Sequence, residues 1–252
     1  MLFRSKVLVV AHELSPYGGS ECAVGWNIVT RLASYHDVTV IYASGSQFND
    51  TSYVNSVNRY HQTNPRIDGL TLVNLDKPPV TRFVSSMNYF LRKISPVGLP
   101  LLYYIGYSYW QKAVLRKAVS LHAINNFSIV HQLTQITFRE PGYLWKLGIP
   151  FVWGPTGGTS TFPGSFHRIL SFQSRLLDRI RTISLYYQFY FSPRVRKAIK
   201  YAATIYVFSR LDEERFKKRA NGNVKVMLDV GTYSQIAVKP AVKINQGKLK
   251  VI

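Results

Sequence analysis

Short runs of apolar residues alternate along the chain with longer segments in which apolar side chains recur at helical spacing. Each apolar run stops at polar or turn-forming residues, which is typical of the buried strands of a parallel sheet. The predicted strands are Val7–Ala11, Val38–Ala43, Leu70–Leu75, Ser128–Leu133, Pro150–Pro155, Thr204–Phe208 and Val224–Leu228.

Helical segments fill most of the gaps between these strands, and residues 46–68 are a loop or a short helix. The first predicted helix follows Ser20, and the second region, 80–126, is helical with breaks at Ser95-Pro96 and Pro100. A third helix is predicted over Phe138–Leu147, with Gly148 as its C-cap. Residues 165–201 are predicted to be helical with a break near Ser192-Pro193, and a last helix follows Ser209 as far as Arg219. This alternation predicts the α/β class, as a doubly wound, mostly parallel, Rossmann-like sheet with helices on both faces. Ligands of such sheets bind outside the carboxyl ends of the strands.

The loop after the first strand is the first candidate site. Gly18 and Gly19 precede Ser20, which can cap the following helix. A glycine loop at a helix N-terminus offers backbone N–H groups and a positive dipole to a phosphate or carboxylate. The adjacent glycines exclude the G-x-G-x-x-G pattern, and no Gly-Lys-Ser/Thr follows them. A tight turn without a ligand remains the alternative.

Composition narrows the class of protein. The chain has 252 residues, of which 46% are hydrophobic, so it can fold as a globular protein. Its one cysteine, Cys22, cannot form an intramolecular disulfide, which favours a reducing, cytoplasmic location. We expect a buried small residue at Cys22, and neither a signal peptide nor a membrane-spanning segment, because the apolar stretch Leu99–Trp110 is too short.

The net charge of +20 implies an acidic partner: nucleic acid, anionic lipid or a phosphorylated substrate. The helical segments 82–118 and 168–200 combine aromatic and basic residues. Three interpretations stay open: a solvated basic face, docking on an anionic membrane surface, and nucleic-acid binding. No nucleic-acid-binding module is visible, so nucleic acid is not the expected partner.

Three motifs together resemble a known family. They are His12-Glu-Leu-Ser-Pro-Tyr-Gly-Gly-Ser-Glu21, Val130-His131 and Gly154-Pro-Thr-Gly-Gly158. Their order and spacing, from Lys6 to about Leu228, resemble the N-terminal domain of a family 4 glycosyltransferase. That family has the GT-B fold, in which two Rossmann-like domains face each other across a cleft.

The resemblance implies a role for each motif. Gly18, Gly19 and Ser20 would lie against the diphosphate of a nucleotide-sugar donor. His131 would face the donor sugar and position it for catalysis. The reaction would retain the anomeric configuration, the departing phosphate would take the acceptor proton, and no metal or other cofactor would be needed. Acceptor or cleft-lining positions would be His12, Glu13, Thr156, Gly157, Gly158 and Thr159.

Structural alternatives accompany these roles. His131 can equally be a hydrogen-bonded core or strand-end residue, and Gly157-Gly158 can be a plain turn. Glu13 and Glu21 could be acid/base carboxylates. Glu21 is better explained as a first-turn acid that complements the helix dipole.

The chain departs from the family after residue 228. Family members carry a second domain with an Arg/Lys pair and a Glu-x7-Glu motif. We expect residues 1–228 to form the Rossmann-like domain and 229–252 to be a linker plus the first strand, Lys248–Ile252, of a missing C-terminal domain. A truncated enzyme, a split enzyme with a partner chain, and an inactive remnant or membrane-docking module are the alternatives. The isolated chain should then be inactive. The expected partners are a nucleotide-sugar, a saccharide or lipid-linked acceptor, and the inner face of a membrane.

Overall fold

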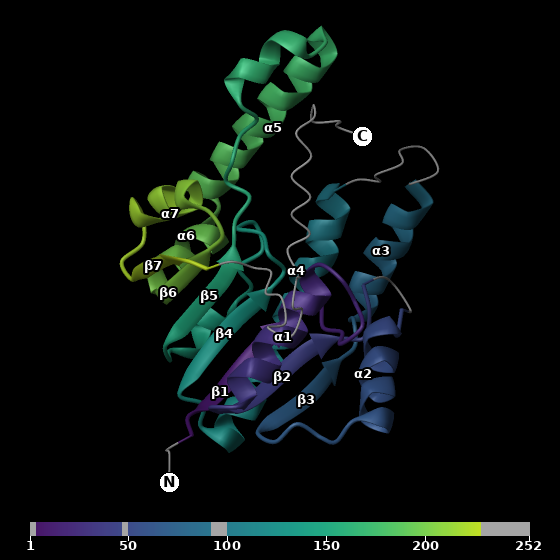
Figure 1. Cartoon of the computed structure of the whole chain (residues 1–252). Coiled ribbons are helices and arrows are strands. Elements are labelled where there is room, and N and C mark those ends of the chain that lie inside the picture. Colours follow the sequence, from purple (N-terminus) through teal and green to yellow (C-terminus); the bar gives the residue numbers. More distant parts are fainter. Residues whose placement is uncertain (1–3, 47–49, 92–99, 228–252) are drawn as a thin grey trace, which may run out of the picture.

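A seven-stranded, all-parallel sheet runs through the described residues of the computed structural model, which are 4–46, 50–91 and 100–227 (Figure 1). The strand order is β3-β2-β1-β4-β5-β6-β7. The predicted linker and strand at 229–252 lie outside the described residues. The strands are β1 (Lys6–Ala11), β2 (Asp37–Ala43), β3 (Leu70–Leu75), β4 (Ile129–Thr134), β5 (Phe151–Thr156), β6 (Ala202–Val207) and β7 (Asn223–Val226).

Strand β1 lies at the point where the strand order reverses. It pairs with β2 on one side and with β4 on the other, so that Val9 is opposite both Val40 and His131. All residues of β1 after Lys6 are buried, which explains its continuous apolar sequence. The β1–β4 boundary is the topological switch point, where open α/β sheets bind ligands.

Helices cover both faces of the sheet and form a three-layer structure (Figure 1). Helices α1 and α2 pack on one face, while α4, the end of α5, α6 and α7 pack on the other. The helices are α1 (Glu21–Ala33), α2 (Ser52–Thr63), α3 (Pro79–Leu91), α4 (Pro100–Asn125), α5 (Phe172–Phe191), α6 (Pro193–Tyr201) and α7 (Arg210–Lys217), with 3-10 turns η1 (Leu144–Leu147) and η2 (Gly164–Ile169).

Alternate residues of β1 enter two separate cores, as a pleated strand requires. Val7 and Val9 pack with Trp26 of α1, in the core that we call the α1-side core. Leu8 and Val10 pack in the core that contains Trp110 of α4, the α4-side core. The doubly wound architecture predicted from the sequence is therefore confirmed.

The helix predicted over Phe138–Leu147 is wrong. Only η1 at its end is helical, and the segment before it is irregular. Pro141 provides no backbone N–H, and Gly142 has a φ of +64°, so the chain turns where a helix would have to continue. The Glu140 carboxylate, 1% exposed, accepts two hydrogen bonds from the Arg194 guanidinium of α6 at 2.8 and 2.9 Å.

Two helix starts show how far capping can be predicted. Ser209 caps α7, because its hydroxyl accepts from the Asp212 N–H. Ser20 precedes α1, but its side chain makes no capping hydrogen bond, and its φ of +52° is left-handed. Its carbonyl instead accepts from the N–H groups of Ala23 and Val24. The expectation of a side-chain cap at Ser20 is therefore wrong.

Candidate functional site

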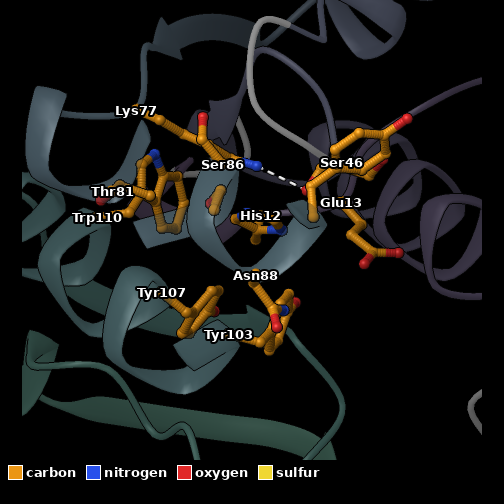
Figure 2. Close-up of a pocket in the computed structure, with 12 residues that line it drawn as sticks. His12, Glu13, Ser46, Lys77, Thr81, Ser86, Asn88, Tyr103, Tyr107 and Trp110 are labelled. Carbon is orange, nitrogen blue, oxygen red and sulfur yellow. Dashed lines mark hydrogen bonds between the residues drawn. The ribbon is translucent and has the colours of Figure 1, made fainter. Parts of the chain in front are cut away.

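A cavity of about 530 Å³ lies between the carboxyl ends of β1–β3 and helices α3 and α4 (Figure 2). Strand ends supply its floor, and the two helices supply its walls. The residues that line it are His12, Glu13, Ser46, Lys77, Thr81, Ser85, Ser86, Asn88, Tyr89, Tyr103, Tyr107 and Trp110. The structure thus places the predicted cleft residues His12 and Glu13 together in a cavity at the carboxyl edge of the sheet.

His12 is held by aromatic rings of α4. Its imidazole makes edge-on contacts with Tyr107 and Trp110, at centroid distances of 5.0 and 4.8 Å. Burial, and the positive charge of Lys77 to a lesser extent, hold the pKa of His12 well below its usual value. The ring is therefore neutral at pH 7. Its Nδ1 is buried and has no hydrogen-bond partner among the described residues, so a ligand in the cavity could supply one.

Glu13 and Lys77 bring opposite charges to the cavity. Burial raises the pKa of Glu13, against the opposing effects of Gln135, Lys77 and Cys22. Burial also lowers the pKa of Lys77 to about 8, although Asp50 and Glu13 act in the other direction. The Lys77 ammonium donates to the Ser46 carbonyl at 2.7 Å (Figure 2). Both groups are thus partly desolvated, and their protonation is sensitive to what fills the cavity.

Hydroxyl groups and aromatic rings make up most of the cavity wall. Of the twelve described residues that line it, seven carry a hydroxyl: Ser46, Thr81, Ser85, Ser86, Tyr89, Tyr103 and Tyr107. Burial raises the pKa of Tyr103 and of Tyr107, so both phenols stay protonated. A cavity with apolar ring faces and several convergent polar groups suits a small polyhydroxylated molecule.

Hydrogen bonds tie the two sides of the switch point together. The Glu13 N–H donates to Thr134 Oγ1 at 3.1 Å, and the Ile136 N–H donates to the Glu21 carboxylate at 3.3 Å. Glu21 lies in the first turn of α1, as predicted, and it also fixes the segment that follows β4. Tyr107 of α4 joins the same segment, because its hydroxyl accepts from the Gln135 N–H.

The glycine loop lies beside this crevice and is partly exposed. Two of its amides are used internally, since Tyr17 and Gly18 both donate to Ser15 Oγ at 3.2 and 3.0 Å. A Cβ on Gly18 would lie 2.7 Å from Cys22 Cβ, whereas one on Gly19 would meet no atom within 4 Å. Gly19 and Ser20 are exposed at the start of α1. The predicted contact of Gly18, Gly19 and Ser20 with a diphosphate remains a prediction.

His131 lies on the other face of the sheet from His12. It is opposite Val9, which packs in the α1-side core, whereas His12 packs against α4. Its Nε2 is 2.6 Å from the Gly154 carbonyl of β5. Because a carbonyl can only accept, Nε2 must carry the hydrogen. Burial lowers the pKa of His131 to about 4, so its ring is neutral at pH 7.

Three of the four predicted positions at the end of β5 and just after it are buried. Thr159 is held by Asp212, which accepts from its N–H at 3.2 Å and from its hydroxyl. Thr156 is also buried, and a Cβ on Gly157 would collide with the Phe208 ring. Of the predicted positions Thr156 to Thr159, Gly158 is the exposed one. Their role on the acceptor side of a cleft stays a prediction.

Sequence reasoning missed Lys77, Tyr103 and Tyr107, because the loop after β3 and helix α4, which carry them, are far from β1 in the chain. It also missed Gly25 of α1, where a Cβ would collide with the Glu13 carbonyl oxygen. A glycine in the interior of a predicted helix was the available signal. Among the described residues, no group of three or more His, Cys, Asp or Glu side chains could hold a metal ion.

Of the comparisons with known proteins, the one with solved structures found similar proteins. No protein-family model matches the chain, and no curated protein matches it. One similar structure is that of Glycyrrhiza uralensis UGT73P12 complexed with glycyrrhetinic acid 3-O-monoglucuronide, with a TM-score of 0.45 and 12% identity over 89% of this chain and 48% of that one. Another is described as trehalose-6-phosphate from E. coli bound with UDP-2-fluoro glucose, with a TM-score of 0.41 and 12% identity over 84% and 42%. This chain spans less than half the length of either.

Proposed function

We propose that the chain is the acceptor-side domain of a retaining, family 4-type glycosyltransferase and that the cavity holds the acceptor saccharide. The observation that carries the proposal is the cavity itself, which lies at the carboxyl edge of the sheet, beside the switch point, and is lined by hydroxyls, aromatic rings, Glu13 and Lys77. Tyr89 and Tyr103 are exposed and offer ring faces to a sugar, while serine hydroxyls and the unpaired His12 Nδ1 offer hydrogen bonds.

The donor is proposed to be a nucleotide-sugar whose diphosphate lies at the start of α1. The support is the exposed Gly19-Ser20 backbone at a helix N-terminus, where an anion is favoured. In the transfer, the acceptor oxygen forms the new bond to the anomeric carbon as the bond from that carbon to the phosphate breaks. The leaving diphosphate takes the acceptor proton, so neither Glu13 nor His131 has to act as a base.

His131 is proposed to act as a positioning residue. Its Nε2 is bonded to Gly154, and its Nδ1 is left with a lone pair on the face of the sheet that carries α1. In the polypeptide translated from the complete reading frame, His131→Ala should lower kcat at least about tenfold, with a smaller change in KM. His131→Gln, which keeps an N–H donor, should recover part of the loss. An unchanged kcat in a folded His131→Ala protein would remove His131 from the mechanism.

The proposed function is tested in two steps. Saturation-transfer NMR on the chain should detect mono- and oligosaccharides, and Tyr103→Ala should weaken that signal. The complete polypeptide, incubated with a panel of nucleotide-sugars and the saccharides that bind, should form a product that retains the donor's anomeric configuration. Inversion at the anomeric carbon would overturn the retaining assignment. Absence of both saccharide binding and transfer would overturn the function.

A further inference from the structure

The first part of α5 is an exposed arm. From Phe172 to Ser184 no side chain of α5 is buried, whereas Leu185 and Phe189, further along, are buried in the α4-side core. Figure 1 shows α5 standing out beyond the carboxyl ends of β4 and β5. A helix that is anchored at one end and exposed on all sides at the other usually has a partner outside the domain.

The arm carries an apolar stripe at helical spacing. Phe172, Leu176, Ile180, Ile183 and Tyr187 follow each other at intervals of three or four residues, so they share one side of the helix. Phe172, Ile180 and Ile183 are 76%, 56% and 69% exposed. Phe166 and Ile169 in the preceding turn η2 are exposed as well. We call the five helical residues the α5 stripe.

Positive charge borders the α5 stripe. Arg179 is three residues after Leu176 and four before Ile183, so it lies directly beside the stripe, with Arg175 one turn earlier. The acid of this region, Asp178, pairs with His167, whose Nε2 is 3.1 Å from the Asp178 carboxylate. Within the part of the chain that the structure describes, Arg175, Arg179 and Arg181 form no ion pair with a carboxylate.

We propose that the α5 stripe docks in the interface of an anionic lipid bilayer, with its arginines among the headgroups. An apolar stripe bordered by uncompensated arginines, on a chain of net charge +20, matches a surface that offers both hydrocarbon and negative charge. Helix α5 lies on such a surface and does not cross it: none of the helices in the described residues is long and apolar enough to span a bilayer. The docking goes beyond glycosyl transfer and needs no substrate.

Docking through α5 brings the carboxyl edge of the sheet toward the lipid. The α5 arm stands out beyond that edge (Figure 1), and the cavity is lined by residues that follow the strands at the same edge. An acceptor saccharide carried on a lipid would then meet the cavity at the membrane surface. This last link rests on the proposed function, whereas lipid binding itself does not.

The test is co-sedimentation of the chain with vesicles, without any sugar. The chain should bind vesicles of phosphatidylcholine mixed with phosphatidylglycerol, bind pure phosphatidylcholine at least about tenfold more weakly, and lose affinity as salt is raised. Ile180→Ser with Ile183→Ser should weaken binding to the mixed vesicles at least about tenfold. Arg175→Gln with Arg179→Gln should remove most of the preference for anionic vesicles.

The matched control is Ile124→Ser, at the end of α4, where the side chain is 76% exposed but belongs to no such stripe. It should bind vesicles like the original chain, and circular dichroism should show all variants folded. Equal binding to neutral and anionic vesicles, or unchanged binding of the stripe variant, would overturn the proposal. So would a dimer that forms without lipid and is lost in the stripe variant, because the stripe would then belong to a second copy. If the chain binds vesicles as expected but the glycosyl-transfer assay gives no product, the result would count against the proposed function and not against lipid docking.

Discussion

Gly25 is a small residue with a large structural effect, because it sets how closely α1 approaches the loop that carries Glu13. A Cβ at this position would collide with the Glu13 carbonyl oxygen and lie 3.4 Å from Leu14 Cδ1. The backbone of Glu13 is also held by the Thr134 hydroxyl on its other side. The position of the Glu13 carboxylate in the cavity therefore depends on a residue that does not line the cavity.

Gly25→Ala should destabilise the chain by about 1–3 kcal/mol, since the added methyl group has to push α1 or the loop away. Urea unfolding measures the loss. Gly19→Ala is the matched control, because a Cβ there meets no atom within 4 Å, and it should change the free energy of unfolding by less than about 1 kcal/mol. Equal losses in the two variants would show that close packing at Gly25 is not the cause.

The His131 ring should be a neutral Nε2–H tautomer throughout the neutral pH range. Its folded pKa, about 4, lies below the ordinary 6.5, so the unfolded chain binds more protons between these values. Stability is therefore lost as pH falls through this window. Nitrogen-15 NMR of the imidazole should show the Nε2-protonated form and no titration above pH 5. A midpoint near 6.5 would contradict the burial and the bond to Gly154.

Lys77 should make stability rise with pH on the alkaline side. Its folded pKa of about 8 is below the ordinary 10.5, so the unfolded chain binds more protons between these two values. Raising the pH from 8 to 10 should therefore stabilise the chain relative to Lys77→Met, by an amount on the order of 2 kcal/mol. Unfolding of both proteins by urea at each pH gives the difference, in which the shared tyrosine titrations cancel. A constant difference would show that the Lys77 ammonium is well solvated.

At the scale of elements, the pair Glu140–Arg194 fastens the irregular segment before η1 to α6. Glu140→Ala would leave the Arg194 guanidinium partly buried without its carboxylate, and it should cost about 3–5 kcal/mol. Glu140→Leu combined with Arg194→Met should be much closer to the original chain, because two apolar side chains need no partner. Chemical unfolding measures both. A loss below about 1 kcal/mol in Glu140→Ala would mean that the ion pair is not fastening the segment.

This segment also shows where prediction from the sequence ends. The seven strands were predicted because each is a short segment rich in apolar residues that ends at polar or turn-forming residues. The breaks at Ser192-Pro193 and Gly148 were predicted from residues that stop helices. The helix over Phe138–Leu147 was predicted from its apolar residues alone. Tertiary contacts decide that segment: the Phe138 N–H donates to Gly157 and Glu140 pairs with Arg194, and both partners are distant in sequence.

Of the candidate site, the part that follows β1 could be predicted from the sequence, but the part contributed by later elements could not. His12, Glu13 and the glycine loop follow β1 directly, so a strand-end argument finds them. Lys77 and the tyrosines of α4 reach the cavity because β3 lies two strands away from β1 and because α4 packs across the sheet. Nor could the sequence show that His12 and His131 belong to opposite faces, since that follows from strand register.

At the scale of the whole molecule, the candidate functional residues near the switch point lie on both faces of the sheet. The cavity and its aromatic wall belong to the α4 side, while His131 lies on the α1 side. The glycine loop lies beside the boundary, next to the hydrogen bonds that join Glu13 to Thr134. The proposed transfer would therefore bring together groups from both layers of helices, with the sheet as the rigid part between them.

The position of β1 between β2 and β4 has a consequence for biosynthesis. β2 and β3 are translated soon after β1, but β4 begins at residue 129, which is 118 residues after β1 ends at residue 11. At 5–20 residues per second, a ribosome takes roughly 6 to 24 s to bridge that interval. During that time one hydrogen-bonding edge of the most apolar strand in the nascent chain has no partner, as in an aggregation-prone intermediate. Chaperones that bind extended apolar segments should therefore engage this chain before residue 129 is made and leave once β4 pairs with β1.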